Sequence, residues 1–176
     1  MLPTDLKALN YHKWDKEEWE AYVNRIGVPE DKAKRQFFRQ VVYDHFEHHN
    51  EHYPEFEIDN YEYNIVKLSV LEVRDKVGFF YGKSIAEMWG DQYDQFEEDN
   101  ADYLIFKKMS QEKTPPFPPI VIDSCQLVDK SWRVYGRPLH LIEGTHRTSY
   151  LIRMAERGII AWQSEHEFVL LTPKIA

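Results

Sequence analysis

The proline run at residues 114–119 (Thr-Pro-Pro-Phe-Pro-Pro) is the feature that most constrains how this chain of 176 residues can fold. Proline has no backbone N–H to donate, and it disfavours the helical conformation for the residue before it. A regular helix therefore cannot pass through this run. The pattern predicts a rigid extended connector, and the Ile-Val-Ile sequence at residues 120–122 predicts a short buried strand directly after it.

Residues 138–158 carry a second strong pattern, a strand followed by a tight turn and a helix. Residues 139–142 are mostly apolar and predict the strand, Gly144 permits the turn, and Thr145 is predicted to cap the helix. Gly158 is a natural end for that helix. The apolar residues that share its core-facing side are Leu151, Met154 and Ala155. Strands that alternate with helices predict an α/β fold.

The N-terminal part of the chain shows helical periodicity. Residues 14–26 predict one helix, which the sequence Gly-Val-Pro then ends. Residues 30–50 predict a second helix with an aromatic face, which begins at Glu30 or Asp31 and ends before Pro54. The aromatic residues expected to form a core between these two helices are Trp14, Trp19, Phe37 and Phe38.

The middle of the chain gives shorter patterns. Residues 65–73 are rich in β-branched and apolar side chains and predict a strand, or a strand followed by a turn. Ser84 is predicted to cap a short helix at residues 85–89, and residues 91–108 predict a second, acidic helix. Residues 123–137 predict a hairpin or loop.

Together these elements predict an α/β (α+β) fold with a small mixed sheet. We expect residues 1–62 to form a helical extension with two helices, and residues 63–176 to form one domain. Cys125 is the only cysteine, so no intramolecular disulfide is expected and stability must come from a packed core.

The charge of the chain is unevenly distributed. Its net value of −8 divides into −6 over residues 1–62, −4 over residues 63–112 and +2 over residues 113–176. An acidic chain is unsuited to DNA or to an anionic membrane, because such binding depends on Lys and Arg. The basic surplus of the last third leaves room for a small anionic ligand there. No apolar stretch approaches the roughly 18–20 residues that a membrane helix requires, and no signal peptide is evident. We therefore expect a soluble, cytoplasmic protein without a membrane partner.

The turn at Gly144 is the candidate binding site. Glycine lets the backbone approach a ligand closely, and the first N–H groups and the positive dipole end of the following helix favour an anion. His146 and Arg147 add donors at this end, and Arg147 can contact two phosphate oxygens at once. Glu143 lies beside them in the sequence.

The order of these elements resembles the ParB/sulfiredoxin superfamily. Residues 119–122 (Pro-Ile-Val-Ile) and residues 139–151 (Leu-His-Leu-Ile-Glu-Gly-Thr-His-Arg-Thr-Ser-Tyr-Leu) match its strand, loop, strand, Gly-x-His-Arg turn and helix. The resemblance spans roughly residues 63–172 and is most specific over residues 115–160. Members include a sulfinic acid reductase, a free-serine kinase and CTP-hydrolysing partitioning proteins, and the resemblance implies a small fold that binds nucleotide phosphates at the turn.

The resemblance also implies the residues of the site. Thr145 stands where sulfiredoxins have their reactive cysteine, so we do not expect the reductase chemistry. The expected ligand is a nucleotide, such as ATP with Mg²⁺, or a small phosphorylated molecule. Its expected binding residues are Gly144, Thr145, His146, Arg147 and Arg74, with Lys83 a weaker candidate. If the protein is a phosphotransferase or a nucleotide hydrolase, the catalytic candidates are Glu143, His146 and Arg147. Glu143, Asp123 or an acidic residue among residues 63–76 would orient the acceptor or hold Mg²⁺.

Plainer interpretations stand beside these. Arg147 can pair with Glu143 instead of a ligand, and His146 can hydrogen-bond to backbone. A cluster of four histidines, His45, His48, His49 and His52, has the spacing of metal ligands on a helix. The alternative, a polar solvated helix face, is the commoner outcome, and no metal site is assigned.

The acidic, aromatic-rich stretch at residues 89–103 supports a rival function. A catalytically inert module, such as an immunity protein or an antitoxin, would use this surface to bind a basic protein partner. The plain alternative is a core helix with a solvated acidic face.

Overall fold

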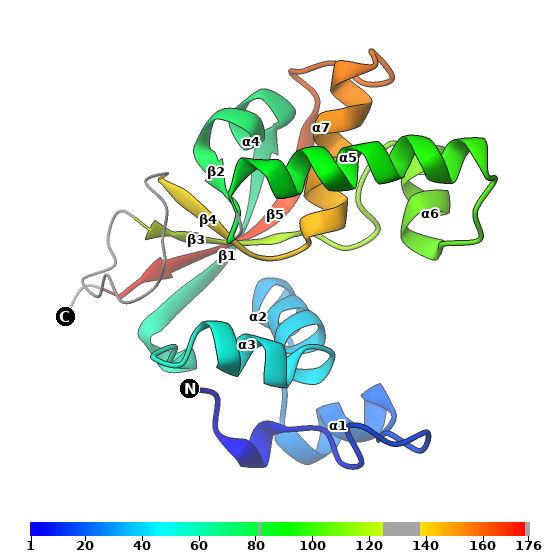
Figure 1. The fold of residues 1–176 in the computed structure, drawn as a ribbon. Coiled ribbons are helices and arrows are strands. Elements are labelled where there is room, and N and C mark those ends of the chain that lie inside the picture. Colours follow the sequence, from blue (N-terminus) through cyan, green and yellow to red (C-terminus); the bar gives the residue numbers. More distant parts are fainter. Residues whose placement is uncertain (81, 125–137, 175–176) are drawn as a thin grey trace.

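In the computed structural model, a mixed sheet of five strands lies at the centre of the described residues, which are 1–80, 82–124 and 138–174 (Figure 1). Its strands are β1 (Tyr61–Ser69), β2 (Val77–Gly78), β3 (Ile120–Asp123), β4 (Leu139–Glu143) and β5 (Glu165–Pro173). The spatial order is β1-β5-β3-β4-β2. The β1/β5 and β3/β4 pairs are antiparallel, whereas the β5/β3 and β4/β2 pairs are parallel. The predicted mixed α/β fold is confirmed.

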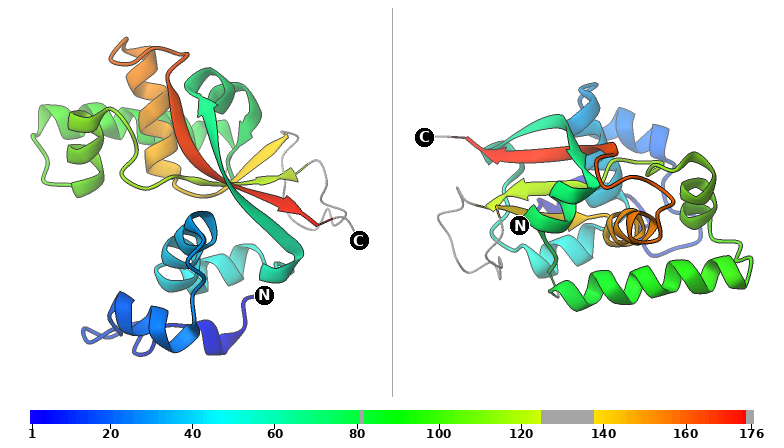
Figure 2. Two further views of the ribbon diagram at one scale, coloured as in Figure 1. Left: turned by 180° about the vertical axis from the view of Figure 1, so that it is seen from behind. Right: turned by 90° about the horizontal axis from the view of Figure 1, so that it is seen from above.

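The N-terminal residues form a helical layer on one face of this sheet (Figures 1 and 2). The elements of this layer are η1 (Thr4–Leu6), α1 (Trp19–Ile26), α2 (Lys32–Phe37), the π-helical segment η2 (Phe38–Tyr43), α3 (Phe46–His52) and η3 (Ile58–Asn60). Phe37, Val42 and Phe56 share one buried core with Ile120 and Leu171 of the sheet. The segment expected as an extension therefore packs directly on the sheet.

The opposite face is covered by a second helical layer (Figures 1 and 2). Its helices are α4 (Val70–Lys76), α5 (Lys83–Glu98), α6 (Leu104–Glu112) and α7 (Thr145–Glu156). Leu151, Met154 and Ala155 of α7 are buried in the core of this layer, as their spacing predicted. None of the described helices is long and apolar enough to cross a membrane.

Strand β3 shows why its sequence is apolar throughout. Ile120 and Ile122 belong to the core under the N-terminal layer, whereas Val121 belongs to the core under the second layer. All three side chains are fully buried. A strand covered on both faces has no exposed side that polar residues would occupy. The proline run precedes it as predicted, because α6 ends at Glu112 and Lys113 takes a left-handed conformation.

The first predicted helix begins later than expected. Helix α1 starts at Trp19, because the preceding residues form a loop whose two ends are joined by hydrogen bonds. The Glu17 N–H donates to the Leu9 carbonyl, and the Leu9 N–H donates to the Glu17 carboxylate, each over 3.0 Å. Trp14 lies in this loop and is 99% exposed, so its assignment to the core was wrong. Gly27 ends the helix in the left-handed conformation.

The second predicted helix is interrupted. Asp31 caps α2 as expected, but the chain leaves helical geometry at His45 before α3 begins. The Tyr11 hydroxyl donates to the carbonyl of Asp44 (2.8 Å), and the Lys16 ammonium donates to that of Tyr43 (2.8 Å). These two side chains from the loop thus donate hydrogen bonds to backbone carbonyl oxygens at the point where the helix breaks. Three residues around the break, Asp44, His45 and His48, line the cavity described below.

The strand predicted at residues 65–73 was only partly right. Strand β1 ends at Ser69, and residues 70–73 belong to α4. Ser69 and Glu72 form a capping box, in which the Glu72 N–H donates to the Ser69 hydroxyl and the Ser69 N–H donates to the Glu72 carboxylate. Val70 and Val73, three residues apart, are both buried on the sheet side of this helix.

The acidic helices also differ from the prediction. Helix α5 runs without a break through Gly90, and it is capped by Gly82 instead of Ser84. Gly90 lies against the Arg153 side chain of α7; a Cβ added to Gly90 would lie 3.6 Å from Arg153 Cβ, so the two helices pack closely here. Strands β2 and β5 were not predicted. Of the predicted hairpin or loop at residues 123–137, residues 125–137 lie outside the described residues.

Candidate functional site

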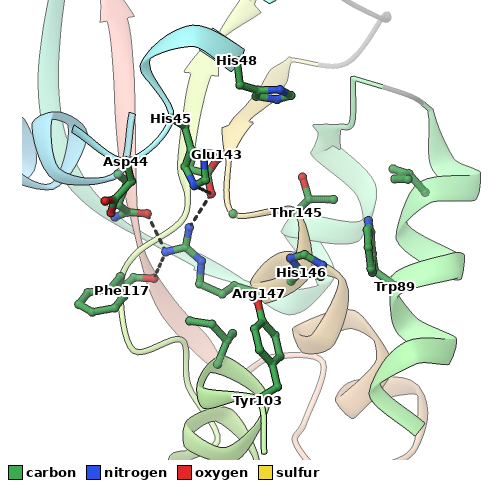
Figure 3. Close-up of a pocket in the computed structure, with 14 residues that line it drawn as sticks. Asp44, His45, His48, Trp89, Tyr103, Phe117, Glu143, Thr145, His146 and Arg147 are labelled. Atoms are coloured by element: carbon green, nitrogen blue, oxygen red, sulfur yellow. Dashed lines mark hydrogen bonds and ion pairs between the residues drawn. The ribbon is translucent and has the colours of Figure 1, made fainter. Parts of the chain in front are cut away.

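A cavity of about 640 Å³ lies at the N-terminal end of α7 (Figure 3). One wall is the β4–α7 turn, residues 143–147. The facing wall comes from the N-terminal layer and contributes Gln40, Asp44, His45 and His48. Apolar side chains of α5, α6 and the neighbouring segments complete it, namely Ile85, Trp89, Tyr103, Ile105 and Phe117. The sequence-predicted turn therefore does border a space large enough for a small molecule.

The Gly144 turn is shaped by packing within the protein. Gly144 has a φ of +105°, and a Cβ added to it would lie 2.8 Å from Pro119 Cβ and 3.1 Å from Arg147 Nη2. Both the conformation and the space therefore require glycine. The close neighbour is the end of the proline run, so the glycine accommodates the chain's own connector rather than a ligand.

Thr145 is the first residue of α7 and not its cap. The N-cap is Gly144, and no side chain caps this end. The prediction of a threonine cap was wrong because the left-handed Gly144 takes the cap position one residue earlier. Thr145 instead lines the cavity, half-buried, together with His146. The first N–H groups of a twelve-residue helix thus lack a side-chain acceptor beside the cavity.

Arg147 is buried and held by the protein itself. Its guanidinium donates to Gln40 Oε1 over 2.6 Å. It also donates to the Phe117 carbonyl (3.0 Å) and to Glu143 Oε1 (3.2 Å), as Figure 3 shows. Only 6% of the residue is exposed, and burial lowers the pKa of the guanidinium from its ordinary value. The interpretation that Arg147 pairs with Glu143 is confirmed. Arg147 ties α7 to the N-terminal layer and to the proline connector.

Gln40 is a site residue that the sequence did not reveal. Its side-chain amide donates to the Pro118 carbonyl (3.1 Å) and to Gln36 Oε1 (2.9 Å), and its oxygen accepts from Arg147. It is 6% exposed. A lone glutamine among the buried aromatic and aliphatic residues of η2 was the available signal, because a buried amide needs partners.

His146 is available to a ligand. Its ring lies edge-on to Trp89, with 3.9 Å between ring centroids, and near Tyr103 and Tyr150 at 5.9 and 6.1 Å. No hydrogen bond of this ring is found among the described residues, so the alternative of a bond to backbone is not seen there. Burial lowers the pKa of His146, the nearby Arg147 lowers it further, and Glu143 opposes them. The ring is therefore neutral near pH 7.

Two carboxylates border the cavity, and each lies close to at least one Arg or Lys side chain. Glu143 Oε1 lies 3.2 Å from Arg147 and 3.9 Å from His45 Nε2. Asp44 lies 3.5 Å from both Lys16 and Arg39. Neither carboxylate therefore faces the cavity as an uncompensated negative charge.

The four histidines do not act as one cluster. His49 is buried between Phe37 and Phe56, and burial, with a smaller effect of the N-terminal amino group, lowers its pKa to about 3. His45 and His48 line the cavity, and His48 stacks near His52 with 4.1 Å between the rings. Within the described ranges, no group of three or more His, Cys, Asp or Glu side chains is arranged to hold a metal ion.

The remaining predicted residues lie elsewhere. Arg74 pairs with Asp75 (2.8 Å) and lies over the Trp162 ring at 4.8 Å. Lys83 is exposed at the start of α5, and Asp123 ends β3. None of these three residues lines the cavity. Glu72, an acidic candidate from residues 63–76, is occupied by the capping box and by Lys76.

The chain matches no family model, no curated protein and no solved structure. The fold and the site thus define a mixed α/β protein with a ligand-sized cavity at a helix N-terminus. The ParB/sulfiredoxin resemblance stays a prediction.

Proposed function

We propose that the cavity binds a nucleotide or another small phosphorylated ligand, with the anionic group at the N-terminus of α7. The observation that carries this proposal is the coincidence of a cavity of about 640 Å³ with a helix start that no side chain caps. Exposed N–H groups and the positive end of the helix dipole favour an anion at such a place. Thr145 and His146 add side-chain donors beside it.

The apolar wall suits the rest of such a ligand. Trp89, Tyr103 and Phe117 border the cavity, and Phe117 is 42% exposed. Aromatic side chains stack on planar rings, and each stacked base is worth about 1–3 kcal/mol. A ligand with a charged end and a planar end would match both walls.

Phosphoryl transfer or hydrolysis extends this proposal. His146 is neutral near pH 7 and so fits a proton acceptor, and Glu143 fits an orienting carboxylate. Arg147 would act by positioning Glu143 rather than by touching phosphate. Magnesium normally uses one or two protein carboxylates and the phosphates themselves, so Glu143 would hold an ion that arrives with the nucleotide. Such an ion would neutralise charge on the phosphate oxygens.

Calorimetric titration of ATP, ADP and CTP with Mg²⁺ tests the proposal. We expect one site, and Trp89→Ala is expected to weaken binding about tenfold through lost stacking. Trp14→Ala is the matched control, since Trp14 is 99% exposed in a loop outside the cavity. Absence of binding by all three nucleotides would overturn the proposal. Phosphate release by the wild type and by Glu143→Gln tests the catalytic extension.

A second candidate function is the binding of a basic protein partner, and the observation that favours it is the exposure of apolar side chains on α5 and α6. Asp94 and Glu97 of α5 are paired with Arg153 and Arg157 of α7. Met88 of α5 and Leu104 of α6 are nevertheless 50% and 60% exposed, and the other exposed residues of α5 include four acidic ones, Glu87, Asp91, Glu97 and Glu98. A pull-down that recovers no protein partner would count against this candidate. DNA binding is disfavoured by the net charge of −8.

A further inference from the structure

The N-terminus of α7 alone does not explain how the cavity would neutralise the charge of an anionic ligand. Arg147 is the only Lys or Arg among the described residues that line it. Its guanidinium is committed to Gln40, Phe117 and Glu143. A phosphate group would therefore meet no free cation on the wall formed by residues 143–147.

The facing wall supplies the missing donors. His45 and His48 lie at the helix break and on α3, and both line the cavity opposite the α7 N-terminus (Figure 3). His45 Nε2 lies 3.9 Å from Glu143 Oε1, and His48 also borders a smaller cavity of about 50 Å³ beside the first. The His45 side chain is 51% exposed and that of His48 is only partly buried, so both can reorient toward a ligand without disturbing the core.

We propose that His45 and His48 bind the anionic group of the ligand as imidazolium ions. This inference rests on the proposed function, and it makes the N-terminal layer part of the binding site. An imidazolium ion donates from both ring nitrogens, and a hydrogen bond to an ionised group is about twice as strong as a neutral one.

The charged and titratable surroundings of the two rings set the direction of the pH dependence. His48 faces Glu143 from β4, and His45, His52 and Glu51 from its own segment. Burial first, and His52 next, lower the pKa of His48, so the ring is largely neutral at pH 7. A bound anion raises that pKa again. Binding therefore takes up protons, and the affinity for an anion rises as the pH falls until the ring is protonated in the empty site.

Sulfate and Mg²⁺–ATP are the probes for the test. Sulfate keeps its charge between about pH 5.5 and 8, so any pH dependence of its binding comes from the protein. We expect wild-type affinity for sulfate to rise at least about tenfold over this range on acidification, which corresponds to one charge-assisted hydrogen bond. Calorimetry in buffers of different ionisation enthalpy should show proton uptake with either probe.

Substitutions distinguish the contribution of His45 and His48 to anion binding from that of the rest of the site. His45→Gln/His48→Gln is expected to abolish both the pH dependence and the proton uptake. His12→Gln, which removes an exposed histidine outside the cavity, should change neither. His48→Lys supplies a permanent cation, and it should restore tight sulfate binding at about pH 8, which a structural role for His48 would not explain.

The outcomes distinguish the two proposals. If neither sulfate nor Mg²⁺–ATP binds at any pH, the proposed function fails and this inference fails with it. If Mg²⁺–ATP binds but the pH dependence and proton uptake persist in His45→Gln/His48→Gln, or if His48→Lys binds no better than wild type at about pH 8, the function stands and this inference is overturned. Far-ultraviolet circular dichroism of each variant confirms that the fold is retained.

Discussion

Replacing Gly144 by alanine should destabilise the protein through two separable effects. The residue has a φ of +105°, a conformation that costs an L-residue about 1–2 kcal/mol. The new Cβ would also lie 2.8 Å from Pro119 Cβ, and relief of such overpacking costs about 1–3 kcal/mol. We expect Gly144→Ala to lower the free energy of unfolding by about 2–5 kcal/mol, a large part of the stability of an ordinary domain.

Urea denaturation followed by circular dichroism measures this loss, and Gly27→Ala is its matched control. Gly27 has a φ of +69° with nothing within 4 Å of the added Cβ, so it reports the backbone effect alone. The midpoint should fall further for Gly144→Ala, with an unchanged slope. If the two variants lose the same stability, the contact between the turn and the proline connector is not what requires a glycine at 144.

Three further predictions concern stability. Arg147→Ala should lower the free energy of unfolding by about 3–5 kcal/mol in urea, because it leaves the half-buried Glu143 carboxylate without its cation and the buried Gln40 Oε1 without its donor. His49 has a folded-state pKa of about 3, below its unfolded value, so the unfolded state binds the extra proton and stability is lost as the pH falls below about 6.5. His49→Phe should therefore remove ~2 kcal/mol of the loss measured between about pH 7 and 5. Ser69→Ala removes the capping box of α4 and should cost ~1 kcal/mol, measured by thermal unfolding against wild type.

The parts of the fold that sequence predicted well are those that local chemistry decides. The proline run excludes a helix whatever surrounds it, and Asp31 and Gly27 mark helix ends by their own conformational preferences. Prediction from the sequence failed where tertiary contacts determine whether a helix continues or breaks. Helix α5 continues through Gly90 because α7 packs against it, and the second helix breaks where Tyr11, from a distant loop, takes the carbonyl of Asp44.

Ser69 shows a conflict between two local signals. Its capping box with Glu72 is readable from sequence, but the β-branched residues Val70 and Val73 favour a strand equally well. Only burial of both valines against the sheet decides for the helix. β-propensity largely reflects burial in a given environment, which sequence alone does not provide.

One wall of the candidate site could be predicted, because residues 143–147 are contiguous in the chain. The rest of the lining comes from segments far away in sequence. Gln40 lies 107 positions from Arg147, and His45 and Trp89 reach the cavity only through the packing of two helical layers. The four histidines were noted for their metal-ligand spacing, with a polar solvated helix face as the favoured interpretation; His45 and His48 are exposed, whereas His49 is buried.

The Gly-Thr-His-Arg turn divides into two pairs of residues with different explanations. Packing accounts for Gly144, which accommodates Pro119, and for Arg147, which holds Gln40 and Glu143. Thr145 and His146, by contrast, line the cavity without a side-chain hydrogen bond among the described residues, so their polar groups have no role assigned within the protein. A loss of ligand binding in Arg147→Ala would thus be explained equally well by the loss of a binding residue or by the loss of the folded structure. Thr145→Val and His146→Phe, by contrast, leave the network of Arg147 intact, so a loss of ligand binding in either variant would locate the function at the start of α7.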